Sequence, residues 1–84
     1  MRKNRSENRI IFDILVFVEK NECSLSSILR NVNLPHSKFK EIEDYLIKRN
    51  LIEKVVKSER IYYRITERGR ELLTQYRKFK ELLE

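Results

Sequence analysis

The hydrophobic pattern of this 84-residue chain changes its period at Asn50. Before that residue, apolar side chains recur every three or four positions, which indicates helices. After it come two short runs rich in β-branched and aromatic residues, 51–57 and 61–65, separated by Ser58-Glu59-Arg60 at hairpin length. A helical period returns after Thr66. The predicted order is therefore three helices, two antiparallel strands and a final helix.

The first two helices have clear limits in the sequence. Amphipathic spacing predicts the first helix over residues 6–20. A shorter helix is predicted over residues 25–32, because the Ser24 hydroxyl can cap it. Pro35 stops this second helix, since the residue before a proline is pushed out of helical geometry.

The third helix is predicted over about residues 38–49, with Ser37 as its cap. Asn50 is expected to end it, because asparagine tolerates the left-handed conformation. The side chains expected to form its buried stripe are Phe39, Ile42, Leu46 and Ile47.

The final helix, 67–84, is expected to start behind a Thr66 cap and carries an apolar seam. Gly69 lies one turn into it and suggests close packing against another backbone. Leu72 and Leu73 are expected to join the local core, whereas the distal apolar residues lie too far along the axis to reach it. The distal apolar residues therefore predict a homodimer through this helix. The alternative is that the whole apolar seam packs on the first helix of the same chain. The candidate interface residues are Leu72, Leu73, Tyr76, Phe79, Leu82 and Leu83.

Composition excludes several classes of function. A single cysteine, Cys23, excludes an intrachain disulfide, and a single histidine excludes the usual multi-histidine metal sites. The chain has no glycine-rich phosphate loop and no nucleophile with an identifiable base, so we expect no enzyme, no cofactor and no small-molecule ligand. No run reaches the ~20 apolar residues of a membrane span, and we expect a cytoplasmic protein. The formal charge of +6, from 19 basic and 13 acidic residues, favours a polyanionic partner.

Two stretches resemble winged helix-turn-helix proteins. Residues 37–52 look like a third helix that ends in the basic pair Lys48-Arg49, followed by a turn residue and a Leu-Ile strand. Residues 63–73 are similar to the aromatic-x-hydrophobic-Thr-x-x-Gly-x-x-Leu-Leu junction between wing and final helix. The resemblance implies an α+β, mainly α fold: a winged helix-turn-helix of three helices and a two-stranded wing, with a C-terminal dimerisation helix.

The chain looks most like small archaeal DNA-binding proteins of the Sso-ten-a chromatin type and related regulators. Members of that group are homodimers joined by an antiparallel coiled coil of their last helices. The resemblance implies double-stranded DNA as partner and a nucleoid-associated location. It divides a single domain, 1–84, into a basic flexible arm (1–5), a winged helix (6–66) and a dimerisation helix (67–84). That last helix, ~27 Å long, is short for such an arm.

In this fold the third helix enters the major groove of DNA. A step of about 100° per residue from the inward-facing Phe39 turns one stripe of the helix outward and leaves two flanks. Basic residues there could reach guanine or phosphate, acidic ones could accept from cytosine, and Ser37 and Tyr45 could bind phosphate. The outward candidates are Ser37, Glu41, Asp44 and Lys48, with Lys38 and Tyr45 on one flank and Lys40 on the other.

Further candidates lie outside the third helix. Arg60 at the wing tip, with Lys57 and Arg64, is expected to reach the minor groove, although a solvated wing charge is an equal alternative. The remaining candidates are the arm residues Arg2, Lys3 and Arg5, the anion-favouring Ser26 and Ser27 at the start of the second helix, and His36 as a phosphate neighbour.

Sequence-selective DNA binding by a homodimeric transcriptional regulator is the function predicted, because two acids on the outward face suit selectivity better than packaging. Two alternatives stay open. The chain could be a small architectural chromatin protein that binds DNA non-specifically. It could also be an interaction module whose third helix faces a protein.

Overall fold

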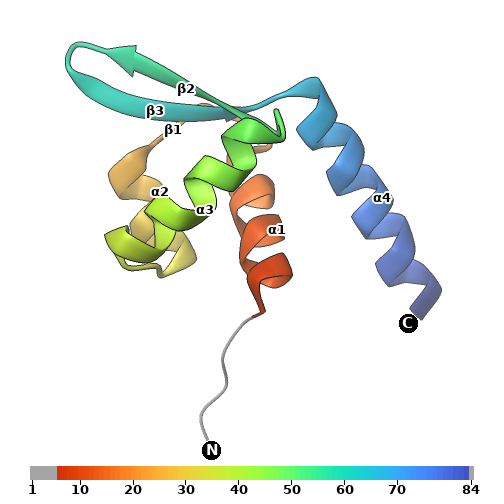
Figure 1. The fold of residues 1–84 in the computed structure, drawn as a ribbon. Helices are drawn as coiled ribbons and strands as arrows, with labels where there is room; N and C mark the ends of the chain where they lie inside the picture. The colour runs from red at the N-terminus through yellow and green to blue at the C-terminus, as the bar shows by residue number, and fades with distance from the viewer. Residues whose placement is uncertain (1–5, 84) are drawn as a thin grey trace, which may run out of the picture.

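The computed structural model describes residues 6–83, which form four helices and a three-stranded antiparallel sheet (Figure 1). The elements are α1 (Glu7–Val18), β1 (Cys23–Ser24), α2 (Leu25–Val32), α3 (His36–Lys48), β2 (Ile52–Lys57), β3 (Arg60–Ile65) and α4 (Glu67–Leu83). The predicted class and order of helices and hairpin strands are confirmed, and β1 is an additional strand.

Helix α1 begins behind Ser6, whose hydroxyl accepts a hydrogen bond from the Arg9 backbone N–H at 3.1 Å. It ends at Val18, two residues before the predicted end. Helix α2 begins with the predicted cap, because the Ser24 hydroxyl accepts from the Ser27 N–H at 3.2 Å.

Helix α3 begins two residues earlier than predicted, at His36, so His36 lies in its first turn and not in the preceding break. The Pro35 carbonyl already accepts from the Phe39 N–H at 3.1 Å, which makes Pro35 the N-cap. The prediction of Ser37 as cap is wrong for this reason. Asn50 follows the helix with φ 60°, the left-handed conformation predicted for it.

The core surrounds α1, which lies between α2 and α4 with α3 and the sheet packed on it (Figure 1). Most of the predicted α3 stripe is buried, but Ile47 is 38% exposed. Glu43 is buried instead, with 8% of its surface exposed. The inclusion of Ile47 in the core was wrong because Ile47 lies about 80° around the helix from Phe39, beyond the buried arc, whereas Glu43 lies only about 40° from it.

Strand β3 is central in the sheet, with β1 on one side and β2 on the other. The β2–β3 hairpin is the wing. Its turn contains two residues, Ser58 and Glu59, with φ values of 49° and 63°, and Arg60 pairs with Lys57 as the first residue of β3. Both positive φ values are typical of the two-residue turns that match strand twist. On the other side, Cys23 pairs with Tyr63, which joins the wing to the start of α2.

Hydrogen bonds of Thr66 hold the junction between the wing and α4 together. Its hydroxyl donates to the Asn50 carbonyl at 2.6 Å and accepts from the Gly69 N–H at 2.9 Å, which confirms the predicted cap. A Cβ atom on Gly69 would lie 2.3 Å from the Leu51 carbonyl oxygen. The predicted close approach of Gly69 to another backbone is therefore confirmed.

Helix α4 is held against α1 by three kinds of contact. Leu73 enters the core, and the rings of Phe12 and Tyr76 stack with centroids 3.7 Å apart. The Arg77 guanidinium binds both carboxylate oxygens of Glu19, at 2.8 and 2.9 Å, and these bonds hold the pKa of Glu19 below its usual value. Leu73 and much of Tyr76 are thus used within the chain itself.

The other apolar residues of α4 face outward. Leu72 is 36% exposed, so the prediction that it joins the local core is wrong. It lies a quarter turn from the buried Leu73, on a side of the helix that α1 does not cover. The distal residues lie beyond the core, as predicted, with exposed fractions of 60% for Phe79, 85% for Leu82 and 71% for Leu83.

Within residues 6–83, no helix combines the length and apolar character that a membrane span requires.

Candidate nucleic-acid interface

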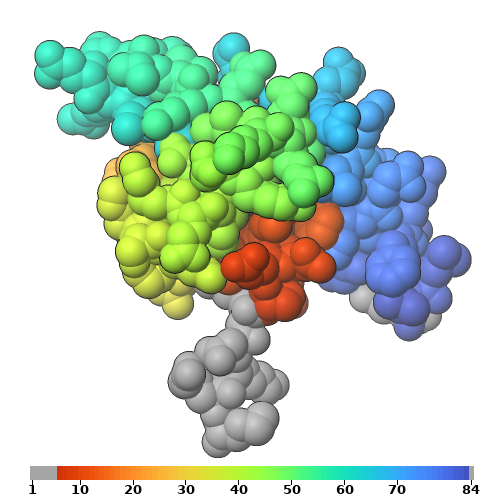
Figure 2. All heavy atoms as spheres, in the orientation of Figure 1, coloured from red at the N-terminus to blue at the C-terminus, as the bar shows by residue number. Residues whose placement is uncertain are grey.

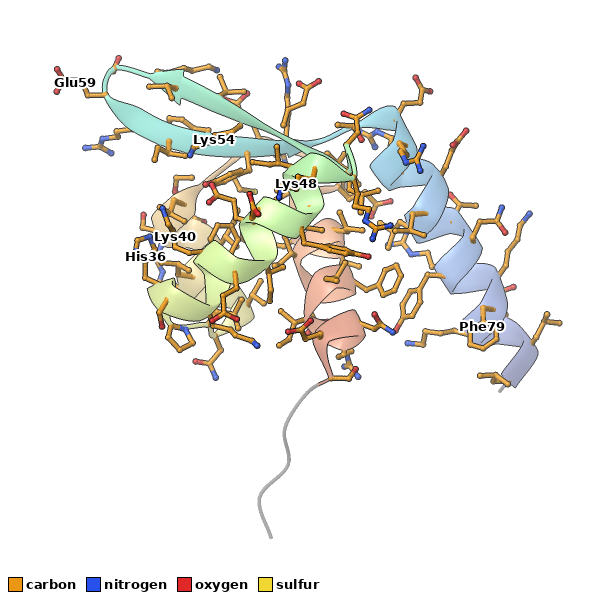
Figure 3. All side chains as sticks on the ribbon, viewed as in Figure 1. His36, Lys40, Lys48, Lys54, Glu59 and Phe79 are labelled. Carbon is orange, nitrogen blue, oxygen red and sulfur yellow. The ribbon has the colours of Figure 1, made fainter. Side chains whose placement is uncertain are left out.

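The wing and α3 form one side of the molecule. Figure 2 shows the wing overhanging the surface of α2 and the start of α3, while α4 lies on the opposite side of α1. His36 and Lys40 point to the same side, below the wing, and Glu59 marks the wing tip above them (Figure 3). A ligand on this side would meet α3 and the wing together.

The outward face of α3 contains the four residues predicted there, and all four are exposed: Ser37, Glu41, Asp44 and Lys48. Its charges are largely compensated. The ammonium of Lys48 lies 3.3 Å from the carboxylate of Asp44, and that of Lys38 lies 3.2 Å from Glu7 and 3.8 Å from Glu41. Lys38 therefore bridges α3 to α1, and the outward stripe carries little net charge.

Lys40 differs from its neighbours on α3. It is exposed on the flank nearer the wing, and within residues 6–83 its ammonium makes no ion pair. An unpaired ammonium can bind a phosphate without first losing a carboxylate partner. Tyr45 lies on the opposite flank, where the Arg49 guanidinium sits 4.7 Å from its ring centre. Lys40 is thus the α3 cation best placed for an anion.

A cluster around the buried Glu43 carboxylate fastens α3 to the wing. The Tyr63 hydroxyl donates a hydrogen bond to the Glu43 carboxylate, and the Lys54 ammonium lies 3.3 Å from the same carboxylate. Burial raises the pKa of Tyr63, and the bond to Glu43 raises it further. The hydroxyl therefore stays a proton donor at physiological pH. We call these three residues the Glu43 cluster.

No role was predicted from the sequence for Lys54, which links the wing to α3 through its ion pair with Glu43. Strand alternation from the apolar Ile52 places it on the core-facing side, opposite Tyr63 in the register. Strand alternation alone could have identified the direction of the Lys54 side chain, but not its partner Glu43, which lies on α3. Only the fold brings Glu43 within reach.

Tyr63→Phe is expected to lower the free energy of unfolding by about 1–3 kcal/mol, because it leaves the buried Glu43 carboxylate without its hydroxyl donor. Urea unfolding followed by circular dichroism measures this loss. Tyr62→Phe is the matched control, since the half-buried Tyr62 pairs with β1 on the next register position but its hydroxyl has no hydrogen bond within residues 6–83. Equal stability of the two variants would contradict the role given to the Glu43 cluster.

Two of the three wing cations predicted to face DNA are held by acids. Lys57 lies 2.7 Å from Glu22, and Arg64 donates to Glu53 at 2.8 Å, a bond that raises the pKa of Arg64. Arg60 is exposed and makes no ion pair with any residue from 6 to 83. Arg60 is therefore the wing counterpart of Lys40.

The remaining candidates contribute less to this surface. Ser26 is exposed, whereas the backbone N–H of Ser27 is already bound to Ser24. Arg2, Lys3 and Arg5 lie outside the described residues.

The Cys23 thiol shows no sign of activation. It donates to the carbonyls of Asn21 at 3.3 Å and Phe17 at 3.6 Å, and burial raises its pKa. Among residues 6–83, no group of three or more His, Cys, Asp or Glu side chains could hold a metal ion.

A short helix, a tight break and an exposed helix followed by a two-stranded hairpin define a winged-helix DNA-binding fold. The sequence model of the winged helix-turn-helix family matches residues 4–84, and the chain belongs to that family. No curated protein sequence matches the chain.

Solved structures of archaeal proteins share this fold. Sso10a-2, a DNA-binding protein from Sulfolobus solfataricus, is 26% identical, with a TM-score of 0.82 over 93% of this chain and 81% of that one. The transcriptional regulator BldR from the same organism is 19% identical, with a TM-score of 0.80, and the match covers 89% of this chain but 57% of BldR. AF1382 from Archaeoglobus fulgidus is 17% identical, with a TM-score of 0.76, over 94% of this chain and 91% of that one.

Proposed function

We propose that the chain is a homodimeric transcriptional regulator that binds double-stranded DNA selectively through α3 and the wing. The observation that carries this proposal is the pairing pattern of the cations. Lys40 on α3 and Arg60 on the wing are exposed without an ion-pair partner in residues 6–83. Lys40 points to the side over which the wing projects (Figure 3), and Arg60 is the first residue after the two-residue wing turn. As a DNA-binding protein it would be nucleoid-associated.

The exposed face of α3 suits the major groove. Lys40 reaches a phosphate or a guanine edge, and Glu41 or Asp44 accepts from a cytosine amino group. Ser37, in the first turn, binds a phosphate oxygen. Arg60 follows the wing toward the adjacent minor groove. Two acids on the reading face oppose binding that depends on charge alone, and for this reason we favour a selective regulator over a packaging protein.

The homodimer is supported by the exposed apolar end of α4. If the exposed parts of Phe79, Leu82 and Leu83 each contribute about 1–2.5 kcal/mol on burial, two chains supply roughly 6–13 kcal/mol. The loss of translational and rotational freedom costs about 4–15 kcal/mol. A twofold dimer would present two copies of α3 to half-sites about 34 Å apart.

Two other functions fit the same fold. An architectural protein that binds DNA without selectivity is favoured by the similarity to Sso10a-2, which is described as a DNA-binding protein. A protein-interaction module is favoured by the ion pairs that neutralise most charges on the outward face of α3.

Binding measured over a salt series separates these functions. A duplex selected from random DNA should bind at least about 10³-fold more tightly than a random duplex of equal length. Equal affinities with a steep dependence on salt would identify an architectural protein. If neither duplex binds even at low salt, the chain is a protein-interaction module and not a DNA-binding protein.

Lys40→Ala is expected to weaken binding to all duplexes about tenfold and to reduce the salt slope by about one per subunit, because one phosphate contact is lost. Fluorescence anisotropy with labelled duplexes measures both quantities. Lys78→Ala removes the same charge from an exposed position on α4, on the opposite side of α1, and should leave the affinity within about twofold. If the two variants bind alike, Lys40 is not part of the interface.

A further inference from the structure

Val56, on the wing, is an apolar side chain that the rest of the chain leaves uncovered. It is 66% exposed, and among the large apolar residues from 6 to 83 only Leu82 and Leu83, at the end of α4, are more exposed. Its register partner Ile61 is half-buried, and the two side chains form an apolar strip near the wing tip. A threonine would keep the same β-branched shape, so folding alone does not require valine at this position.

The apolar strip lies on the face of the wing that is turned toward α3. Side chains alternate between the faces of a strand, so Val56 shares a face with Ile52 and Lys54. Ile52 is buried in the core, and the Lys54 ammonium lies 3.3 Å from the carboxylate of Glu43 on α3. Val56 lies two residues closer to the tip, where the wing overhangs the start of α3 (Figure 2). It therefore faces the side below the wing, to which Lys40 also points (Figure 3).

The charges below the wing favour a phosphate group. Lys40 is exposed and has no ion-pair partner within residues 6–83. The carboxylate of Glu43 is buried and is compensated by Lys54, and Glu59 lies at the wing tip, beyond Val56 (Figure 3). An unpaired cation near an apolar strip matches the chemistry of a sugar–phosphate backbone, in which charged phosphates alternate with largely apolar deoxyriboses.

The DNA complex proposed above requires a backbone at this place. A sugar–phosphate backbone separates the major groove of a duplex from the minor groove. If α3 lies in the major groove and the wing tip lies in the adjacent minor groove, one strand passes between these two elements. This strand would place a phosphate at Lys40 and a sugar against Val56.

We propose that Val56 selects deoxyribose over ribose in the strand that passes between α3 and the wing. The inference rests on the DNA-binding function proposed above and adds a residue that recognises the sugar. Deoxyribose has only hydrogen atoms on its 2′ carbon and packs against Val56 and Ile61. A ribose turns its 2′-hydroxyl group toward the same apolar strip, where the hydroxyl loses water without gaining a hydrogen bond.

Ribose substitution in the duplex selected from random DNA tests this role. Each duplex of a set carries two adjacent ribonucleotides at a different position of one strand. The parent chain should bind about tenfold more weakly when they occupy one short block in each half-site, because a hydroxyl group is buried there without a partner. Val56→Thr offers that hydroxyl a hydrogen bond and should reduce the loss at the same block to about threefold or less. Fluorescence anisotropy measures each affinity.

Two controls separate the hydroxyl group from other effects. Val55→Thr makes the same substitution on the opposite face of β2 and should keep the full loss of affinity at the ribose block. Sugars with a 2′-fluorine share the pucker of ribose but carry no hydroxyl group. The parent chain should tolerate them at the same block within about threefold.

The outcomes distinguish this role from the DNA-binding function itself. If the parent chain binds the selected duplex but ribose has no effect at any position, Val56 does not recognise the sugar, and the function stands. The same holds if Val55→Thr relieves the loss as well as Val56→Thr does, or if 2′-fluoro sugars weaken binding as much as ribose. Failure of the parent chain to bind the duplex would overturn both the function and the role of Val56.

Discussion

Gly69→Ala is expected to lower the free energy of unfolding by about 3 kcal/mol, although alanine is the better helix former by about 1 kcal/mol. The new methyl group would lie 2.3 Å from the Leu51 carbonyl oxygen and 2.7 Å from a side-chain carbon of Ile65. The first of these is a backbone atom, which cannot rotate away. The junction between wing and α4 must therefore open.

The opening breaks hydrogen bonds as well as packing. The same Leu51 oxygen accepts from the Thr66 N–H at 3.1 Å, and the Thr66 hydroxyl caps α4 through the Gly69 N–H. Displacing these buried groups costs about 1–3 kcal/mol each, which outweighs the gain in helix propensity.

Thermal unfolding of Gly69→Ala should show a midpoint lower by about 12–24 °C, and urea unfolding measures the loss of free energy directly. Thr74→Ala is the control, because it also places alanine on α4 and removes an exposed methyl group and a hydroxyl that bonds within its own helix. A midpoint for Gly69→Ala within about 2 °C of the parent would contradict the observed junction.

Phe79→Ala is expected to weaken the dimer about 30- to 1000-fold. Because 60% of Phe79 is exposed in the single chain, its burial at an interface contributes about 1–2 kcal/mol, and a twofold dimer contains two copies. Sedimentation equilibrium measures the dissociation constant. Apparent affinity for a duplex with two half-sites should fall in parallel, whereas the stability of the single chain should change little.

Lys78→Ala provides the comparison for Phe79→Ala, since it shortens the adjacent side chain on another face of α4. It should leave the dissociation constant within about threefold. If Phe79→Ala sediments as the parent does, the exposed stripe of α4 is not the dimer contact.

Much of the fold could be predicted from short-range patterns. The Ser24 and Thr66 caps and the left-handed Asn50 each depend on chemistry within a few residues. The close approach of Gly69 is to Leu51, on another part of the chain, but a glycine inside a helix was enough to indicate it. Strand β1 could not be predicted in the same way. It has two residues, too few to show a period, and it is a strand only because β3 lies beside it.

The candidate surface was less predictable than the fold. Exposure of the outward stripe of α3 follows from helical geometry alone, and that part is confirmed. The ion pairs are different. Lys38 meets Glu7 from α1, and Lys57 meets Glu22 from before β1, so tertiary contacts decide which cations stay unpaired. The burial of Glu43 has the same cause, because Tyr63 lies twenty residues further along the chain.

The Glu43 cluster leaves α3 and the wing little freedom to move apart, since a buried carboxylate ties the two together. A duplex bound by both elements then meets a protein in which the distance between α3 and the wing is fixed. Where that distance differs from the spacing of the DNA grooves, the DNA deforms and not the protein, so the duplex must bend or twist to fit. The stiffness of base steps that the chain does not contact would thereby influence which DNA sequences it binds.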